Sequence, residues 1–280
     1  MAGPAFRCDN VSMRNFLIRL SVAVAGIPAL LWIFYQGGHW LNVLVGLLTI
    51  AACFEVWQAA QMREVPVAFW MLGLLALSLP LVVWPRGGDM WIIWTMAACF
   101  GSAVWVVWRR DPLLGAFAAL TQIAAALWIG VGFGSLIVLR ALPSGQGFRW
   151  LVFLFAILWI GDTVAYLAGS WIKGPKLSPR VSPNKTVAGA IAQLLASSLI
   201  GLIYIVAGWI EGSTGLIMAS ALTVGAVGQV GDLFESVFKR AVGLKDFSAL
   251  IPGHGGVLDR FDSTLFAAPA LWILIRLWTA

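Results

Sequence analysis

Acidic and basic side chains gather in one short stretch of this chain, from Gly231 to Ser263. In a sequence that is 61% hydrophobic and 11% charged, the stretch holds five carboxylates, four cations and one of only two histidines. Its first part repeats polar residues at helical spacing, while apolar residues take the opposite side. The polar residues are Asp232, Glu235, Ser236, Lys239 and Arg240. The pattern predicts that the preceding apolar helix continues as an amphipathic one.

The second part of the stretch is a glycine-rich loop that leads into a helix start. Asp259 and Asp262 stand three residues apart there, so a helix would place them on one face. Oxygen ligands of this kind suit Mg²⁺, which binds one or two carboxylates together with substrate phosphates. Zinc is disfavoured, because His254 has no cysteine nearby. Between glycines, His254 is either structural or a phosphate contact.

A second pair of polar residues lies inside an apolar run. Asp162 and Tyr166 are four residues apart and share a helix face. An ionisable group within a membrane span predicts a site by default, although a hydrogen-bonded structural pair is the alternative. Glu55, in an earlier apolar run, is interpreted as structural.

A basic polar segment, 173–185, precedes another apolar helix. It ends in Ser182, Pro183, Asn184, Lys185 and Thr186. An ammonium group and a helix N-terminus both favour anions, so this end predicts a phosphate-binding site. The alternative is a basic loop that touches anionic lipid, which accounts for the Lys and Arg residues but not for the others.

These groups are positioned by a membrane protein. Apolar runs of about 20 residues recur along the 280-residue chain, the length that a helix needs to cross a bilayer. The runs are continuous rather than alternating, which favours helices over a barrel. We expect an all-α fold in one integral membrane domain, 1–280, with N-terminal spans in 1–149 and the catalytic spans and loops in 150–280. Nine spans are predicted, at 16–36, 40–61, 66–84, 90–108, 113–139, 150–172, 186–209, 213–230 and 264–279.

The distribution of charge predicts the orientation. Of eighteen Lys and Arg residues, all but Arg86, Arg140, Arg149 and Arg276 fall on the side of the N-terminus. The positive-inside rule therefore predicts a cytoplasmic N-terminus, and both long polar segments then face the cytoplasm. The net charge of +6 lies in short loops, which disfavours a nucleic-acid partner. The first apolar run lacks a cleavage pattern and is expected to be retained.

Two further features are interpreted as structural. The three cysteines have no close spacing and are expected to be inert thiols. The run Gly130, Gly132 and Gly134 has no βαβ context, so close helix packing is favoured over phosphate binding.

The charged stretch resembles the phosphatidate cytidylyltransferases, also called CDP-diacylglycerol synthases. The family motif is met without a gap by Ser236, Lys239, Arg240, Lys245, Asp246, Pro252, His254, Gly255, Gly256, Asp259, Arg260 and Asp262. Asp162 with Tyr166, and Ser182 through Thr186, resemble the family as well, so the similarity covers roughly 160–263. One departure is Ala188, where members often have Glu.

The resemblance implies a nucleotidyltransferase of phospholipid biosynthesis in the cell (inner) membrane, with its active site on the cytoplasmic side. It implies that CTP and phosphatidate give CDP-diacylglycerol and pyrophosphate with Mg²⁺ as the cofactor, and it leaves a second cation open. Asp232, Asp259 and Asp262 would be the metal ligands and, with Lys185, the catalytic residues. The substrate-binding residues would be Ser182, Asn184, Lys185, Lys239, Arg240, His254, Arg260, Asp162 and Tyr166. A homodimer is also suggested.

Two other functions compete with this one. A CDP-alcohol phosphatidyltransferase also pairs aspartates with Mg²⁺, but its spaced aspartate motif is absent. A cation-coupled transporter would use the acids as an ion path, yet such paths lie near the midplane rather than at one membrane face.

Overall fold

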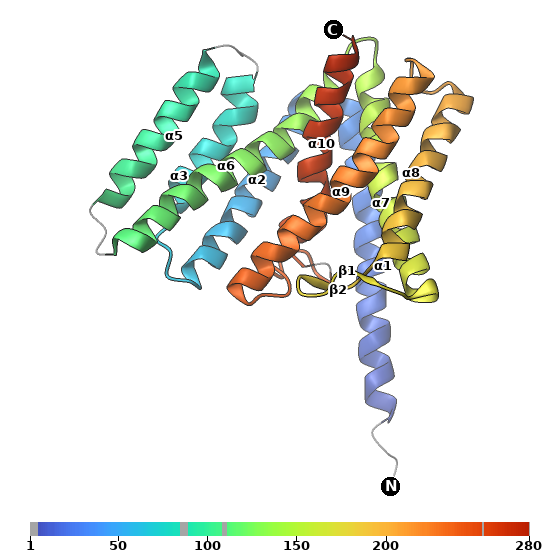
Figure 1. The fold of residues 1–280 in the computed structure, drawn as a ribbon, viewed down its shortest axis with the longest axis horizontal. Coiled ribbons are helices and arrows are strands. Elements are labelled where there is room, and N and C mark those ends of the chain that lie inside the picture. The colour runs from blue at the N-terminus through green and yellow to red at the C-terminus, as the bar shows by residue number, and fades with distance from the viewer. Residues whose placement is uncertain (1–4, 85–88, 108–110, 254, 280) are drawn as a thin grey trace.

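The computed structural model describes residues 5–84, 89–107, 111–253 and 255–279, with the backbone alone for 5–19 and 83. Helices dominate these ranges (Figure 1). They are α1 (Ala5–Gln36), α2 (Gly38–Gln61), α3 (Phe69–Ser78), α5 (Met90–Val107), α6 (Pro112–Arg140), α7 (Gln146–Ile172), α8 (Val187–Ala207), α9 (Thr214–Val242) and α10 (Leu258–Thr279). A π-helical segment, η1 (Leu79–Val83), continues α3.

The structure confirms the predicted fold class, an all-α membrane protein. Each of the nine predicted spans corresponds to a helix, and in the described ranges seven helices are long and apolar enough to cross a bilayer. Leu20–Gln36 and Phe69–Val82 are shorter apolar helices. The second of them is interrupted by Pro80, which lies in the π-helical segment.

A small β-hairpin interrupts the helical pattern, and the sequence did not predict it. Strand β1 (Lys176–Ser178) pairs antiparallel with β2 (Ser182–Thr186), with Lys176 opposite Thr186. The sequence predicts only a basic polar segment between two apolar helices here. The hairpin ends where α8 begins, so it delivers Lys185 to the start of that helix.

Helix α6 lies between two groups of helices. It packs against α2, α3 and α5 on one side and against α10 on the other (Figure 1). Its alternating glycines allow this: a Cβ on Gly130 would meet the Ala76 carbonyl at 2.6 Å, and one on Gly132 would meet the Leu265 backbone at 2.9 Å. The helix-packing interpretation of the glycine run is confirmed.

The polar segments meet at one end of the bundle. Figure 1 shows the hairpin at the same end as the start of α1 and the end of α9. Arg63, after α2, donates to the Ala241 carbonyl at 2.6 Å, and Arg240 donates to the Val181 carbonyl at 3.2 Å. Segments far apart in sequence are therefore tied together at this end.

Helix α9 runs unbroken to Val242, as the periodicity predicted, and its polar side faces inward. Glu235 is fully buried and Ser236 is 7% exposed, whereas Phe234, Val237 and Phe238 are exposed. An inward polar face suits a protein whose surroundings are apolar. The helix thus carries its charged groups toward α10 and the hairpin.

Candidate active site

A cleft of about 1390 Å³ opens beside the hairpin. Its walls come from α1, α7, α8, α9, α10 and the hairpin. The structure brings to it most of the residues that the sequence singled out, which are Asp162, Tyr166, Asn184, Lys185, Asp232, Lys239, Asp259, Arg260 and Asp262. Ser182 and Arg240 lie outside its lining, and His254 lies outside the described residues.

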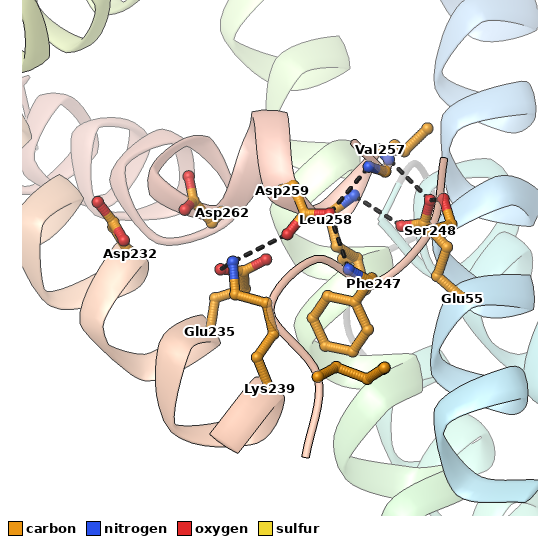
Figure 2. A network of polar contacts seen from close by, with 12 residues as sticks. Glu55, Asp232, Glu235, Lys239, Phe247, Ser248, Val257, Leu258, Asp259 and Asp262 are labelled. Carbon is orange, nitrogen blue, oxygen red and sulfur yellow. Dashed lines mark hydrogen bonds and ion pairs between the residues drawn. The ribbon is translucent and has the colours of Figure 1, made fainter. Parts of the chain in front are cut away.

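Three carboxylates form an acidic cluster, which we define as Asp232, Glu235 and Asp262. One oxygen from each lies within 4.8 Å of the others. Asp232 and Glu235 are one turn apart on α9, and Asp262 reaches them from the first turns of α10 (Figure 2). Asp262 Oδ1 accepts a hydrogen bond from the Ser263 amide at 2.6 Å. Convergent oxygens at this spacing fit a divalent cation.

Glu235 belongs to the acidic cluster but is not among the site residues predicted from the sequence. The sequence predicts it only as part of the polar side of α9. Its side chain is fully buried and forms an ion pair with Lys239 at 2.5 Å. The spacing held a signal, because a residue three positions after Asp232 shares its face.

Asp259 has a different environment from the acidic cluster. Its Oδ1 accepts from Lys239 at 2.8 Å, and its Oδ2 accepts from the amides of Phe247 and Gly256 at 2.9 and 2.8 Å (Figure 2). Donors of the protein itself therefore occupy both oxygens. The metal role predicted for Asp259 stays a prediction, and the acidic cluster contains Glu235 as its third carboxylate.

Glu55 of α2 also reaches this region, and it is fully buried. Its carboxylate accepts from the amides of Val257 and Leu258, each at 2.8 Å, and from the Ser248 hydroxyl at 2.6 Å. Free amides at a helix start favour an anion, so Glu55 caps α10. These contacts agree with the structural interpretation of Glu55.

Lys185 lines the cleft from the hairpin. It belongs to β2 and directly precedes Thr186, which caps α8 by accepting a hydrogen bond from the Gly189 amide at 3.1 Å. The Lys185 ammonium pairs with Asp232, and both side chains are 28% exposed. The predicted anion-binding end is thus next to the acidic cluster.

Three further predicted residues lie on α7 and at the end of α9. Asp162 accepts from the Gln193 amide group at 3.0 Å, and Tyr166 is 75% exposed. Arg240 donates to Val181 and also to the Leu244 carbonyl at 3.1 Å. Arg240 therefore joins the hairpin to the end of α9, a role that the sequence did not predict.

The cleft combines two kinds of groups with complementary chemistry. The acidic cluster offers oxygen ligands alone, which suits Mg²⁺ better than zinc. Lys185 and Arg260 offer cations to an anionic substrate. These features define an integral membrane protein suited to bind a phosphate-bearing substrate together with a divalent cation.

The comparisons with known proteins agree with this class. The chain belongs to the Cytidylyltransferase family, whose model matches residues 17–278. Proteins named phosphatidate cytidylyltransferase from Staphylococcus saprophyticus and Staphylococcus aureus are each 31% identical over 260 residues, covering 92% of this chain and 98% of their own length. One from Staphylococcus epidermidis is 31% identical over 264 residues. The predicted resemblance is therefore confirmed over nearly the whole chain.

Proposed function

We propose that this chain condenses CTP with phosphatidate in the cleft, and that it releases CDP-diacylglycerol and pyrophosphate. The activity follows from full-length similarity to phosphatidate cytidylyltransferases. The observation that carries the location is that Lys185 pairs with Asp232 of the acidic cluster within one cleft. The enzyme is thus a nucleotidyltransferase of phospholipid biosynthesis.

The reaction brings two polyanions together. An oxygen of the lipid phosphate attacks the α-phosphorus of CTP, a new P–O bond forms, and the bond to the β-phosphate oxygen breaks so that pyrophosphate leaves. No general base is needed, because a phosphate monoester is already ionised at neutral pH. Catalysis then depends on positioning and on neutralising negative charge.

The residues of the cleft divide this work. Lys185 at the start of α8 and Arg260 on α10 are placed to bind phosphate oxygens, with Asn184 beside them. Lys239 pairs with both Glu235 and Asp259, so its positive charge offsets part of the negative charge of these carboxylates. Asp162 and Tyr166 line the wall of α7 and would meet the substrates there. Ser182 would support the hairpin that carries Lys185.

We assign the metal site to Asp232 and Asp262 together with Glu235, and we keep Asp259 as the predicted further ligand. The all-oxygen donor set fits Mg²⁺. When bound, the ion would neutralise and orient the triphosphate. A second cation would need oxygen ligands in the same cleft in addition to those of the acidic cluster.

The orientation completes the proposal. The cleft lies at the end of the bundle that carries most of the basic loops, which the positive-inside rule assigns to the cytoplasm. CTP would then arrive from the cytoplasm and phosphatidate from the adjacent leaflet of the cell membrane. The homodimer suggested by the resemblance is a separate expectation, which the mass of the detergent-solubilised protein would test.

Incorporation of radiolabelled CTP into lipid by the purified protein tests the function. We expect product only when phosphatidate and Mg²⁺ are both present. A CDP-alcohol phosphatidyltransferase would instead consume CDP-diacylglycerol, and a transporter would consume neither. Loss of CTP without labelled lipid would contradict the proposal.

A further inference from the structure

Glu55 connects two parts of the chain that are about 200 residues apart. Its carboxylate extends from α2 in the N-terminal half and contacts Ser248 and Val257 in the loop that precedes α10, and Leu258 at the start of α10 (Figure 2). The side chain is fully buried. A buried carboxylate is costly unless it is saturated with donors, and here three donors meet its two oxygens.

The contact requires a carboxylate at this position. Val257 donates to one oxygen and Leu258 to the other, so both oxygens must be acceptors. Glutamine would turn an amide NH₂ group toward one of these N–H groups. The space is also fitted closely, because a Cβ on Gly256 would collide with the Glu55 carboxylate.

From this loop a continuous series of polar contacts leads to the acidic cluster. Asp259 is one residue past Leu258 and accepts from the amides at both ends of the loop, Phe247 and Gly256. The other oxygen of Asp259 accepts from Lys239, which pairs with Glu235. Fixing the first residue of α10 therefore fixes Asp259 directly and the cluster through Lys239.

The helix itself provides a second connection. Leu258 begins α10, and Asp262 lies one turn later on the same helix. The direction of the first turn of α10 determines how close the Asp262 carboxylate lies to the Asp232 carboxylate. A cap on Leu258 holds this direction, since the initial amides of a helix have no partner within it.

We infer that Glu55 is a positioning residue for the reaction. Through the start of α10, it holds the Asp259–Lys239 pair and the spacing of the acidic cluster. The inference rests on the proposed function, because it assigns Glu55 a role in that activity. Glu55 does not line the cleft, so it acts through the loop and not on the substrates.

Two substitutions test this role at different strengths. Glu55→Gln removes one acceptor oxygen and the charge, and Ser248→Ala removes one donor to Glu55 while leaving both backbone contacts. We expect Glu55→Gln to lower kcat about 10- to 100-fold and to raise the Mg²⁺ concentration for half-maximal rate, as loss of a group supporting metal ligands does. KM for CTP should change by a smaller factor than kcat, since Lys185, one of the two cations proposed to bind phosphate, lies on the separate hairpin. Ser248→Ala should move kcat and the Mg²⁺ midpoint in the same direction by a smaller factor.

Gln122→Ala is the matched control for stability. Gln122 is equally buried and accepts from the Ala68 amide at 2.7 Å, so it also holds a backbone segment next to a neighbouring helix, but it does not line the cleft. We expect it to lower thermal stability and to leave kcat and the Mg²⁺ midpoint unchanged. Equal kinetic effects of Gln122→Ala and Glu55→Gln would overturn the inference.

A readout independent of activity completes the experiment. Hydrogen exchange of peptides covering 247–258 should become about tenfold faster in Glu55→Gln and less so in Ser248→Ala, while exchange of α5 stays as in wild type. If Glu55→Gln does not fold, Ser248→Ala decides alone. Wild-type kinetics together with wild-type exchange in the folded variant would overturn the inference. Inactive wild-type protein with faster exchange in the variant would instead contradict the proposed function.

Discussion

The cleft has two ends built from the same residue types, and they differ in how far their carboxylates are satisfied. At the open end, Lys185 and Asp232 are each 28% exposed, and Asp262 faces them. At the closed end, Lys239 is 12% exposed and the Asp259 side chain 2% exposed, with Glu55 behind them. Carboxylates whose oxygens accept hydrogen bonds from the protein stabilise the structure. Carboxylates with free lone pairs can bind a metal ion or exchange one partner for another.

Glu235 lies where the two ends meet. It belongs to the acidic cluster through its oxygens and to the closed end through Lys239. Asp232 pairs with Lys185, Glu235 and Asp259 share Lys239, and Asp262 adds a fourth carboxylate next to Asp232 and Glu235. The excess of acid at the open end is what a divalent cation would balance.

The largest effect is expected at the open end, from Asp262→Asn. This change removes a charged oxygen of the acidic cluster at nearly constant size. We expect kcat for CTP- and Mg²⁺-dependent turnover of phosphatidate to fall at least about 10²-fold, the scale on which loss of one preorganised electrostatic contact acts. Initial rates with labelled CTP measure it.

Asp111→Asn is the control for that change. Asp111 caps α6 by accepting from the amides of Leu113 and Leu114 at 2.8 and 3.1 Å, and Asn caps about as well as Asp. It should leave the rate unchanged. Wild-type rates in Asp262→Asn would rule out the metal assignment and remove the distinction between the two ends.

A smaller loss is expected from Lys185→Gln, which removes the cation of the open end. The triphosphate or the lipid phosphate would lose a charged donor, worth roughly 1.5–3 kcal/mol, or about 10- to 100-fold in kcat/KM. Lys185→Arg keeps the charge and should lose less. Steady-state kinetics with each substrate varied in turn measure both variants, and equal losses would show that charge at Lys185 is not what matters.

Much of this arrangement was predictable from local pattern. Apolar runs located the helices, and the spacing of Asp232, Glu235 and Lys239 predicted the polar side of α9, because helical periodicity fixes which residues share a face. The closed end was not predictable in the same way. Glu55 meets Val257 across 202 positions, and nothing in its own neighbourhood indicates this partner. The hairpin was missed because its two short strands, Lys176–Ser178 and Ser182–Thr186, hold few residues of high strand propensity.

The closed end is tested next by Gly256→Ala. Its Cβ would collide with the Glu55 carboxylate, so the loop must shift or the carboxylate must leave its amides. We expect destabilisation of about 1–3 kcal/mol, as for other overpacked sites. Thermal unfolding in detergent measures the loss. Gly46→Ala on α2, where a Cβ would meet nothing within 4 Å, should be neutral or slightly stabilising, and a similar loss there would contradict the explanation.

The smallest effect is expected where the open end is anchored, from Arg240→Gln. Arg240 joins Val181 of the hairpin to Leu244, and its loss should loosen the hairpin that carries Lys185. Because the contact is exposed, its loss should weaken CTP binding by less than about 1 kcal/mol. We therefore expect KM for CTP to rise only about threefold while kcat stays unchanged. Arg180→Gln removes the same charge from the exposed turn of the same hairpin, so it controls for long-range attraction of CTP. If both variants raise KM equally, Arg240 contributes only charge. A fall in kcat for Arg240→Gln alone would place it at the substrate, as the sequence motif first suggested.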